Sequence, residues 1–336
     1  MAAPSWSERV RELLKRMNNF HEPGSSQERC LPFLVAGQRV GSAPPQVAQR
    51  LQDYPAVFTV YPAPGRIELH PQLVSHEQRT AAVGQVLGEL RELGDFPCLR
   101  GWRDEHYEVM AQFWDPPLFS MERAATSLLG VHCYGVHVNG YTWRQGQPCM
   151  WLGRRTLSKP TYPGRLDNLA AGGIAAGLGV METLLKECQE EACIPPTLAA
   201  QARPVGTISY TYEDARGIFP ECQFVFDLEL PPDFEPQVGD GEMQEFRLLG
   251  LEEVKEAIPA GDFKPNCALV ALDFLIRHGH IQPDHGENRA RAQPTGAGSK
   301  GHQQGWLGAA GQDCAHLLLP TEPHYAELVM GLHRPL

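Results

Sequence analysis

A glycine-rich stretch that runs directly into an acidic helix is the feature that most constrains this chain. "AAGGIAAGLG" occupies residues 170–179, and "LLKECQEEACIP" follows at 184–195. Glycine lets the chain turn tightly and lets a ligand approach the backbone. The helix gathers Glu187, Glu190 and Glu191, although like charges three or four positions apart destabilise a helix by ~0.2–0.5 kcal/mol per pair. The pattern therefore predicts that something outside the helix compensates these charges.

The spacing of the apolar residues indicates which side of this helix faces a core. An α-helix advances about 100° per residue, so one arc carries Met181, Leu184, Leu185, Cys188 and Ala192. The three glutamates fall in a neighbouring arc, near the C-terminal end where the helix dipole disfavours anions. A divalent cation would reverse the repulsion, and Mg²⁺ and Mn²⁺ prefer carboxylate oxygens shared with substrate phosphates. The alternative is a solvated acidic face without a ligand.

The charge balance limits the partners of the chain. Its 336 residues include 29 Lys and Arg against 40 Asp and Glu, a formal net charge of -11. This argues against a general binder of nucleic acid or anionic membranes, which needs a basic surface, but leaves room for a small anionic ligand. The nine cysteines form no C-x-x-C pair and are odd in number, which indicates a reducing compartment. No apolar run reaches the ~20 residues that span a bilayer.

The pattern along the chain predicts two domains of the α+β class. Residues 1–128 form the smaller domain, and residues 129–285 mix strands and helices without a regular βαβ repeat, which favours a sandwich over a doubly wound fold. Residues 286–321 have no period, and a structureless insert of this length is uncommon in a compact domain. We interpret them as a retained intron expected to be disordered, because their ends can be encoded as splice-donor and splice-acceptor sequences. A C-terminal helix follows in 322–336.

Several elements can be placed from local signals. The first is an amphipathic helix at the start, for which a mitochondrial presequence is the alternative that Glu8 counts against. Helices are predicted over 76–93 and over 120–130, the second with Ser120 as N-cap and Gly130 as its stop. No catalytic constellation is visible before residue 128. Further strands are predicted at 134–143, 148–156, 205–213 and 221–230, with helices at 251–258 and 266–279.

The glycine-rich stretch and its helix resemble the Nudix box. That pattern is Gly, five residues, Glu, seven residues, then Arg-Glu-aliphatic-x-Glu-Glu-x-Gly-aliphatic. Gly172 matches the first glycine, and residues 186–191, "KECQEE", match the Arg-Glu-x-x-Glu-Glu core. The chain departs from the pattern at Leu178, which replaces Glu, at Lys186, which replaces Arg, and at Cys193, which replaces Gly. Lysine does not make the forked contact by which arginine would orient a glutamate.

Four stretches narrow the resemblance: "YGVHVNGYT", "LDNLAAGG", "ECQEEA" and "FKPNCALVALDFLIRHG". They look like the Nudix branch related to thiamine pyrophosphokinase annotations, whose fungal and plant members act on thiamine diphosphate and its oxidised or damaged analogues. The resemblance covers nearly the whole chain except 286–321. It implies an α/β/α sandwich with a mixed sheet, preceded by an α+β domain. It also implies a metal-dependent hydrolase that gives the monophosphate and phosphate. We expect a cytoplasmic location, with a mitochondrial one as the alternative.

The resemblance also implies roles for individual residues. Mg²⁺ or Mn²⁺ would be held against a diphosphate by Glu187, Glu190 and Glu191. The general base would be one of these, or Glu242 or Glu245 in the acidic turn "GDGEMQEFRLL". The phosphate oxygens of the substrate would be bound by basic side chains and by the glycine-rich stretch. The residues are Arg154, Arg155, Lys159, Arg165, Gly172 and Gly173. Solvated loop cations are the alternative for the basic residues.

Other polar and aromatic residues of this half have less specific roles. Candidates for contact with a substrate ring are Trp143, Tyr162, Tyr210 and Tyr212, with a place in the core as the alternative for each. Asp167 and Asn168 are expected to fix the turn ahead of the glycine stretch rather than to do chemistry. His137, in a predicted strand, is expected to be structural.

Two other functions stay open. One is a catalytically weak Nudix module that binds a nucleotide or coenzyme as a sensor or scaffold, which the departures from the box favour and the intact glutamate trio opposes. The other is a diphosphate isomerase, in which a Cys and a Glu would exchange protons with an alkene, but no strong cysteine candidate is visible. The sequence does not indicate the oligomeric state.

Overall fold

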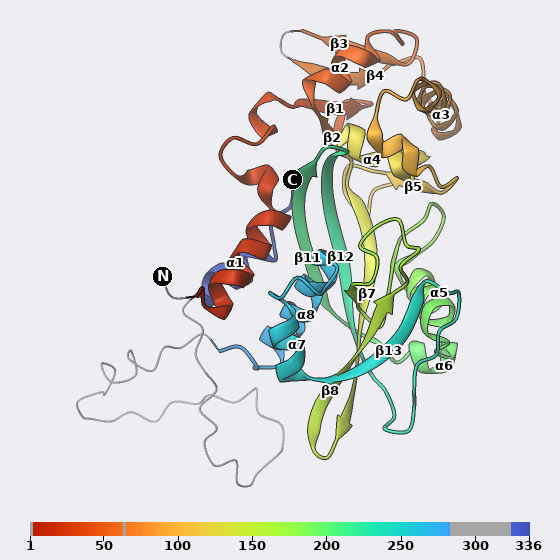
Figure 1. The fold of residues 1–336 in the computed structure, drawn as a ribbon. Helices are drawn as coiled ribbons and strands as arrows, with labels where there is room; N and C mark the ends of the chain where they lie inside the picture. Colours follow the sequence, from red (N-terminus) through yellow and green to blue (C-terminus); the bar gives the residue numbers. More distant parts are fainter. Residues whose placement is uncertain (1–2, 63–64, 283–323) are drawn as a thin grey trace, which may run out of the picture.

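Two large β-sheets in separate parts of the chain, each with its own hydrophobic packing, organise the molecule (Figure 1). The computed structural model describes residues 3–62, 65–282 and 324–336. The insert predicted at 286–321 lies outside the described residues. Both parts mix helices with strands, so the α+β class predicted from the sequence is confirmed.

The first part is built on a four-stranded sheet in the order β2-β1-β4-β3, in which β1 and β4 run parallel. A separate hairpin, β5 with β6, shares its hydrophobic core. The strands are β1 (Leu31–Val35), β2 (Gln38–Ala43), β3 (Phe58–Tyr61), β4 (Arg66–Leu69), β5 (His106–Val109) and β6 (Phe119–Glu122). The helices are α2 (Pro45–Leu51), α3 (His76–Leu93) and α4 (Thr126–Leu129), with 3-10 turns η1 (Asn19–His21), η2 (Gln27–Arg29), η3 (Pro97–Gly101) and η4 (Arg123–Ala125).

Helix α3 confirms the helix predicted over 76–93. The Ser75 side chain caps its first turn, the Gln78 side chain bonds back to the Ser75 backbone, and Gly94 ends it at φ 72. Its buried residues are those that the helical period places on one face, namely Val83, Val86, Leu87 and Leu90.

The helix predicted over 120–130 is only half right. Ser120 lies in β6, paired with Glu108 of β5, and is therefore not an N-cap. All four residues of β6 are buried, and this burial outweighs the local preference for a helix. The helical part is η4 followed by α4, which ends at Gly130 with φ 51, as predicted.

The second part is built on a seven-stranded mixed sheet. The order is β11-β12-β7-β8-β13, with β10 beside β7 and β9 beside β8, and only β12 and β7 run parallel. The four strands predicted in this half are confirmed as β7, β8, β11 and β12, and the sheet also contains β9, β10 and β13. Their bounds are β7 (Cys133–Arg144), β8 (Gln147–Arg155), β9 (Leu166–Asp167), β10 (Ala170–Gly173), β11 (Arg203–Asp214), β12 (Gly217–Glu229) and β13 (Met243–Gly250).

Strands β7 and β8 diverge halfway along their length. Residues 140–144 of β7 pair with β8, whereas residues 135–138 pair with β10. On the other side, residues 153–154 of β8 pair with β9. Strands β9 and β10, which follow one another in the chain, therefore line the two sides of the opening between β7 and β8.

Helices cover both faces of this sheet. On one face, α5 (Val180–Ala192) packs with α6 (Pro196–Ala199) against Val136 and Val138 of β7. On the other, α7 (Leu251–Ala257) and α8 (Pro265–Arg277) pack against Tyr141, whose side chain points to the opposite side of the pleat. The result is the α/β/α sandwich that the family resemblance implies. None of the helices in the described ranges is both long and apolar enough to cross a membrane.

The first helix belongs to the core of this second part. Helix α1 (Trp6–Met17) starts with a capping box formed by Ser5 and Glu8. Its Leu14 shares a core with Leu328 of α10 (Tyr325–Gly331) and with α8, and Figure 1 shows α1 beside the C-terminal segment. The domain boundary at residue 128 stays a prediction, but the buried Val10, Leu14 and Met17 of the first helix belong to the hydrophobic core of the second part.

Candidate active site

Strand β10 brings two of the three glutamates to the opening between β7 and β8. The backbone N–H of Ala171 donates to Glu191 Oε2 at 2.9 Å, and Glu191 is only 3% exposed. A Cβ at Gly172 would overlap the carboxylate of Glu187, so only glycine leaves room for this carboxylate against the strand. The stretch predicted as a glycine-rich loop therefore begins as a strand, over 170–173.

Lys186 lies between the carboxylates of Glu187 and Glu190. Its Nζ is 3.1 Å from Glu187 Oε1 and 2.9 Å from Glu190 Oε2. Burial acts to lower the pKa of Lys186, but the hydrogen bond to Glu190 and the charge of Glu187 outweigh it and raise that pKa. Lys186 is therefore a permanent cation that partly neutralises the exposed side of the glutamate group.

The positive charge near Glu187 and Glu191 does not balance the negative charge of the carboxylates around them. Burial raises the pKa of Glu187, against the lowering effect of Lys186. Burial and the charge of Asp167 raise the pKa of Glu191 well above its ordinary value, against the lowering effect of the Ala171 N–H. The charge of Glu242 acts in the raising direction on both groups. A cation placed among them would reverse these shifts.

The two candidate bases of the acidic turn, Glu242 and Glu245, lie in different surroundings. Backbone N–H groups of residues 239–240 donate to carbonyls in the last turn of α5, at 3.3 and 2.8 Å, which fastens the turn to the helix. Glu242 follows directly and pairs with Lys159. Glu245 lies further along in β13, where its carboxylate is 3.8 Å from Arg154. Of these two residues, Glu242 is the one whose charge acts on Glu187 and Glu191.

Three of the predicted phosphate-binding cations lie at the end of β8 or in its connection to β9. Lys159 is already paired with Glu242. Arg154 donates to Asp262 at 3.2 Å, yet its Nε is buried without a hydrogen-bond partner among the described residues. Arg165 is exposed, and its side chain forms no ion pair within the described ranges. These three side chains can exchange solvent or surface partners for an anion.

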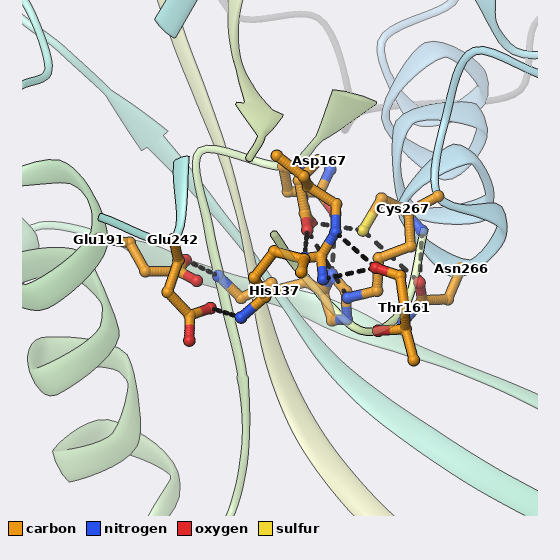
Figure 2. A network of polar contacts seen from close by, with 12 residues as sticks. His137, Thr161, Asp167, Glu191, Glu242, Asn266 and Cys267 are labelled. Atoms are coloured by element: carbon orange, nitrogen blue, oxygen red, sulfur yellow. Dashed lines mark hydrogen bonds and ion pairs between the residues drawn. The ribbon is translucent and has the colours of Figure 1, made fainter. Parts of the chain in front are cut away.

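The fourth cation, Arg155, belongs to a buried network centred on Asp167 (Figure 2). Arg155 is 4% exposed and donates to Asp167 Oδ2 at 2.6 Å. The thiol of Cys267 donates to Asp167 Oδ1 at 2.7 Å, and Lys264 Nζ lies 3.7 Å from Oδ2. Burial alone would raise the pKa of Asp167, but Lys264 and Arg155 hold it below its ordinary value. Arg155 is therefore committed inside the fold rather than presented to a substrate.

His137 adjoins this network and stays uncharged. Its Nδ1 lies 2.8 Å from Asn168 Oδ1. Burial, together with the nearby charge of Lys264, lowers the pKa of His137 to about 4. At physiological pH this ring is neutral, which agrees with the structural role expected for it.

The four candidates for contact with a substrate ring differ in exposure and in position. Trp143 is 49% exposed beside the β7–β8 turn, at the end of β7 away from β10. Tyr210 is fully buried and donates to Glu221 at 2.7 Å. Tyr212 is half-buried and stacks on Phe219 with centroids 4.6 Å apart. Tyr162 lies half-buried in the loop after β8 at φ 50. Tyr162 and Tyr212 are therefore the two that keep some surface without lying at the far end of β7.

The donor set fits a divalent cation in chemistry, although its side chains are held by other partners. Within the ranges that the structure describes, no three His, Cys, Asp or Glu side chains are gathered as ready ligands. Glu187 and Glu190 share Lys186, Glu191 accepts from Ala171, and Glu242 pairs with Lys159. The raised pKa values of Glu187 and Glu191 indicate carboxylates that would gain from an added cation.

Sequence reasoning misses two features. Asp167, predicted to fix a turn, is the centre of the buried network. The second feature is Tyr107 of β5, whose hydroxyl occupies the space beside Gly173 of β10. Cys267 lies 100 positions from Asp167 and Tyr107 lies 66 positions before Gly173. No local pattern signals either contact.

Comparison with known families matches two models along the chain. The first, "Domain of unknown function (DUF4743)", covers residues 9–133, and the second, "NUDIX domain", covers residues 134–267. The chain is 42% identical over 255 residues to Nudix hydrolase 24, chloroplastic, of Arabidopsis thaliana, covering 76% of this chain and 69% of that protein. It is 39% identical over 278 residues to Nudix hydrolase 20, chloroplastic, of the same plant, covering 80% and 74%. A C. elegans Ap4A hydrolase structure aligns with TM-score 0.34 at 18% identity, over 44% of this chain and 98% of that one.

Proposed function

The chain belongs to the Nudix hydrolase family, and on that premise we propose that its substrate is thiamine diphosphate or an oxidised or damaged analogue of it. As a Nudix hydrolase it acts on diphosphates, and the products of the proposed reaction are the monophosphate and phosphate. The observation that carries the site is the group of mutually repelling carboxylates at the opening between β7 and β8. The thiamine part rests on the sequence resemblance alone.

We propose Mg²⁺ or Mn²⁺ as the cofactor. Glu187, Glu190 and Glu191 would hold it, with Glu242 close enough to join them. When bound, such a cation neutralises the diphosphate and acidifies a water molecule. Oxygen donors of this kind suit these hard cations better than zinc, which favours histidine and cysteine.

Residues of the chain itself would bind the phosphates, accept the proton and position the glutamates. Arg154, Lys159 and Arg165 offer donors to phosphate oxygens from the end of β8 and its connection to β9. Either Glu187 or Glu242 accepts the proton of the water that attacks phosphorus, while the bond from phosphorus to the bridging oxygen breaks. Lys186 positions Glu187 and Glu190 through single contacts to each. Arg155 contributes indirectly, because it fixes the end of β8 from inside.

A panel of diphosphates with Mn²⁺ tests the proposal. We expect phosphate release by the wild-type chain to be fastest with thiamine diphosphate or its oxidised analogues. The variant with both Glu190→Gln and Glu191→Gln is expected to lose about 10²-fold or more in rate. Undiminished release by this variant would contradict the assigned glutamates. Diphosphate binding without any release by the wild type would favour the binding-module alternative.

We further propose a cytoplasmic location. Helix α1 packs Val10, Leu14 and Met17 into the core beside α8, as expected for a helix retained in the folded protein rather than for a removed presequence. A fluorescent fusion at the C-terminus of the full chain tests this, and mitochondrial fluorescence would support the alternative.

A further inference from the structure

Three consecutive residues of β10 each meet a different functional group. Ala171 donates its N–H to Glu191, and Gly172 makes room for the carboxylate of Glu187. At Gly173, a Cβ would overlap the hydroxyl of Tyr107, which belongs to β5 in the domain of unknown function. The two sides of the strand pleat explain this arrangement, because neighbouring residues point to opposite faces. The strand that contacts Glu187 and Glu191 is therefore contacted on its other face by the N-terminal domain.

The same domain holds the chain just beyond β10. The backbone N–H of Ala176 donates to the carbonyl of His106 at 2.8 Å, next to Tyr107. Phe113 packs on Tyr134 of β7 and Phe224 of β12, with centroids 4.7 and 4.6 Å apart. Among the strands that the structure describes, β10 pairs only with β7, and it contains two glycines, so its strand hydrogen bonds constrain it weakly. The contacts from the N-terminal domain add to the restraint that α5 provides.

Tyr107 is itself fixed within its domain. It is 6% exposed, and the guanidinium of Arg123 lies over its ring, 5.1 Å from the centroid. Arg123 in turn donates to Glu105 at 2.7 Å. Burial raises the pKa of Tyr107, so its hydroxyl is neutral. This side chain is a rigid spacer with a polar tip.

We propose that the N-terminal domain completes the active site, with Tyr107 as a positioning residue for β10. This inference rests on the proposed diphosphate hydrolase function and names a role for the domain of unknown function. Tyr107 acts through Gly173, on the strand that sets Glu187 and Glu191.

The wild type separates this inference from the proposed function. Absence of Mn²⁺ binding and of turnover in the wild type would overturn the proposed function, whatever the effect of substituting Tyr107.

Hydrogen exchange tests Tyr107 without relying on turnover. In Tyr107→Leu we expect faster exchange at the amides of Ala171 and Ala176, weaker binding of Mn²⁺ alone, and a lower kcat at similar KM. Tyr107→Phe, which keeps the ring, should recover most of each. Unchanged exchange in β10 together with unchanged Mn²⁺ affinity in Tyr107→Leu would overturn the positioning role. If Tyr107→Leu does not fold, Gly173→Ala, which places a Cβ where the Tyr107 hydroxyl lies, applies the same test from the other side.

Discussion

Two groups of charged side chains flank the opening between β7 and β8, and they are balanced in opposite ways. Around Asp167, the fold supplies Arg155 and Lys264, and these cations hold the pKa of the carboxyl below its ordinary value despite burial. Around Glu191, the fold supplies one backbone N–H and further carboxylates, and the pKa rises well above its ordinary value. Figure 2 shows Asp167 and Glu191 in the same view.

The difference indicates which group is structural and which is functional. A buried carboxylate with its own cations contributes to a defined fold and gains nothing from a ligand. A buried carboxylate without them is unfavourable until a ligand supplies the charge, and such perturbed groups gather at functional sites. The two groups should therefore respond differently to substitution, to pH and to added metal.

We call the carboxylate of Asp167 with its cations the balanced group, and the box glutamates the unbalanced group. Removing Asp167, the centre of the balanced group, should cost the most stability. We expect Asp167→Ala to lower the free energy of unfolding by about 3–5 kcal/mol, because it leaves the buried Arg155 and the half-buried Lys264 without their partner. Urea unfolding measures the change. Asp262→Ala, which removes the half-exposed partner of Arg154, should cost about 1 kcal/mol or less. Similar losses for the two variants would contradict the distinction.

Affinity for Mn²⁺ should fall as the pH falls. The pKa values of Glu187 and Glu191 are raised, chiefly by burial, so protons compete with the metal at pH values where ordinary carboxyls are already ionised. Each proton displaced changes the affinity by about ten-fold per pH unit below the raised pKa. Titrations in buffers of different ionisation enthalpy should also detect proton release on binding. A pH-independent affinity with no proton release would contradict the unbalanced group.

Neutralising Glu191 should stabilise the metal-free protein. Because its folded pKa is raised above the ordinary value of 4.5, the stability that its proton provides is complete below pH 4.5 and is lost as the pH rises through the folded pKa. Glu191→Gln avoids this loss, and we expect a gain of roughly 0.5–2 kcal/mol at about pH 8 in the presence of a chelator. Thermal unfolding measures it. A destabilised Glu191→Gln under these conditions would assign Glu191 to the balanced group.

A substitution at the C-terminal end of α5 should give the smallest gain in stability. Cys193 caps the helix in the left-handed conformation, with φ 52, where the Nudix box has glycine. Cys193→Gly should stabilise the fold by about 0.5–1 kcal/mol without altering Mn²⁺ affinity, because it relieves the backbone without touching the carboxylates. Chemical denaturation and metal titration together check this, and a change in metal affinity would mean that the cap sets the position of Glu190 or Glu191.

The sequence predicts what depends on neighbours in the chain. The α5 glutamates, the α3 face and the stop at Gly130 follow from helical period and capping. The sandwich follows from strand-like runs that flank one acidic helix, and the mixed sheet is what the family resemblance implies. What it does not predict depends on pairing across the fold. Ser120 is drawn into β6 by β5, and Arg155 is turned inward by Asp167.

The candidate site follows the same division. Glu187, Glu190 and Glu191 can be named from spacing, but their difference in exposure cannot, because it depends on how β10 lies along α5. Likewise, the separation of Glu242 from Glu245 depends on where the acidic turn is fastened to α5. The contact of Tyr107 with Gly173 joins two domains and has no counterpart in any local pattern.

Calorimetric titration of Mn²⁺ into the full chain, with and without methylenediphosphonate, tests most directly whether the unbalanced carboxylates form a metal site. We expect saturable binding by the wild type, tightened by the diphosphonate, and its loss in the variant that carries Glu190→Gln and Glu191→Gln. Failure of the folded wild type to bind the metal under either condition, or equal binding by the variant, would contradict the assignment of these carboxylates to a metal site.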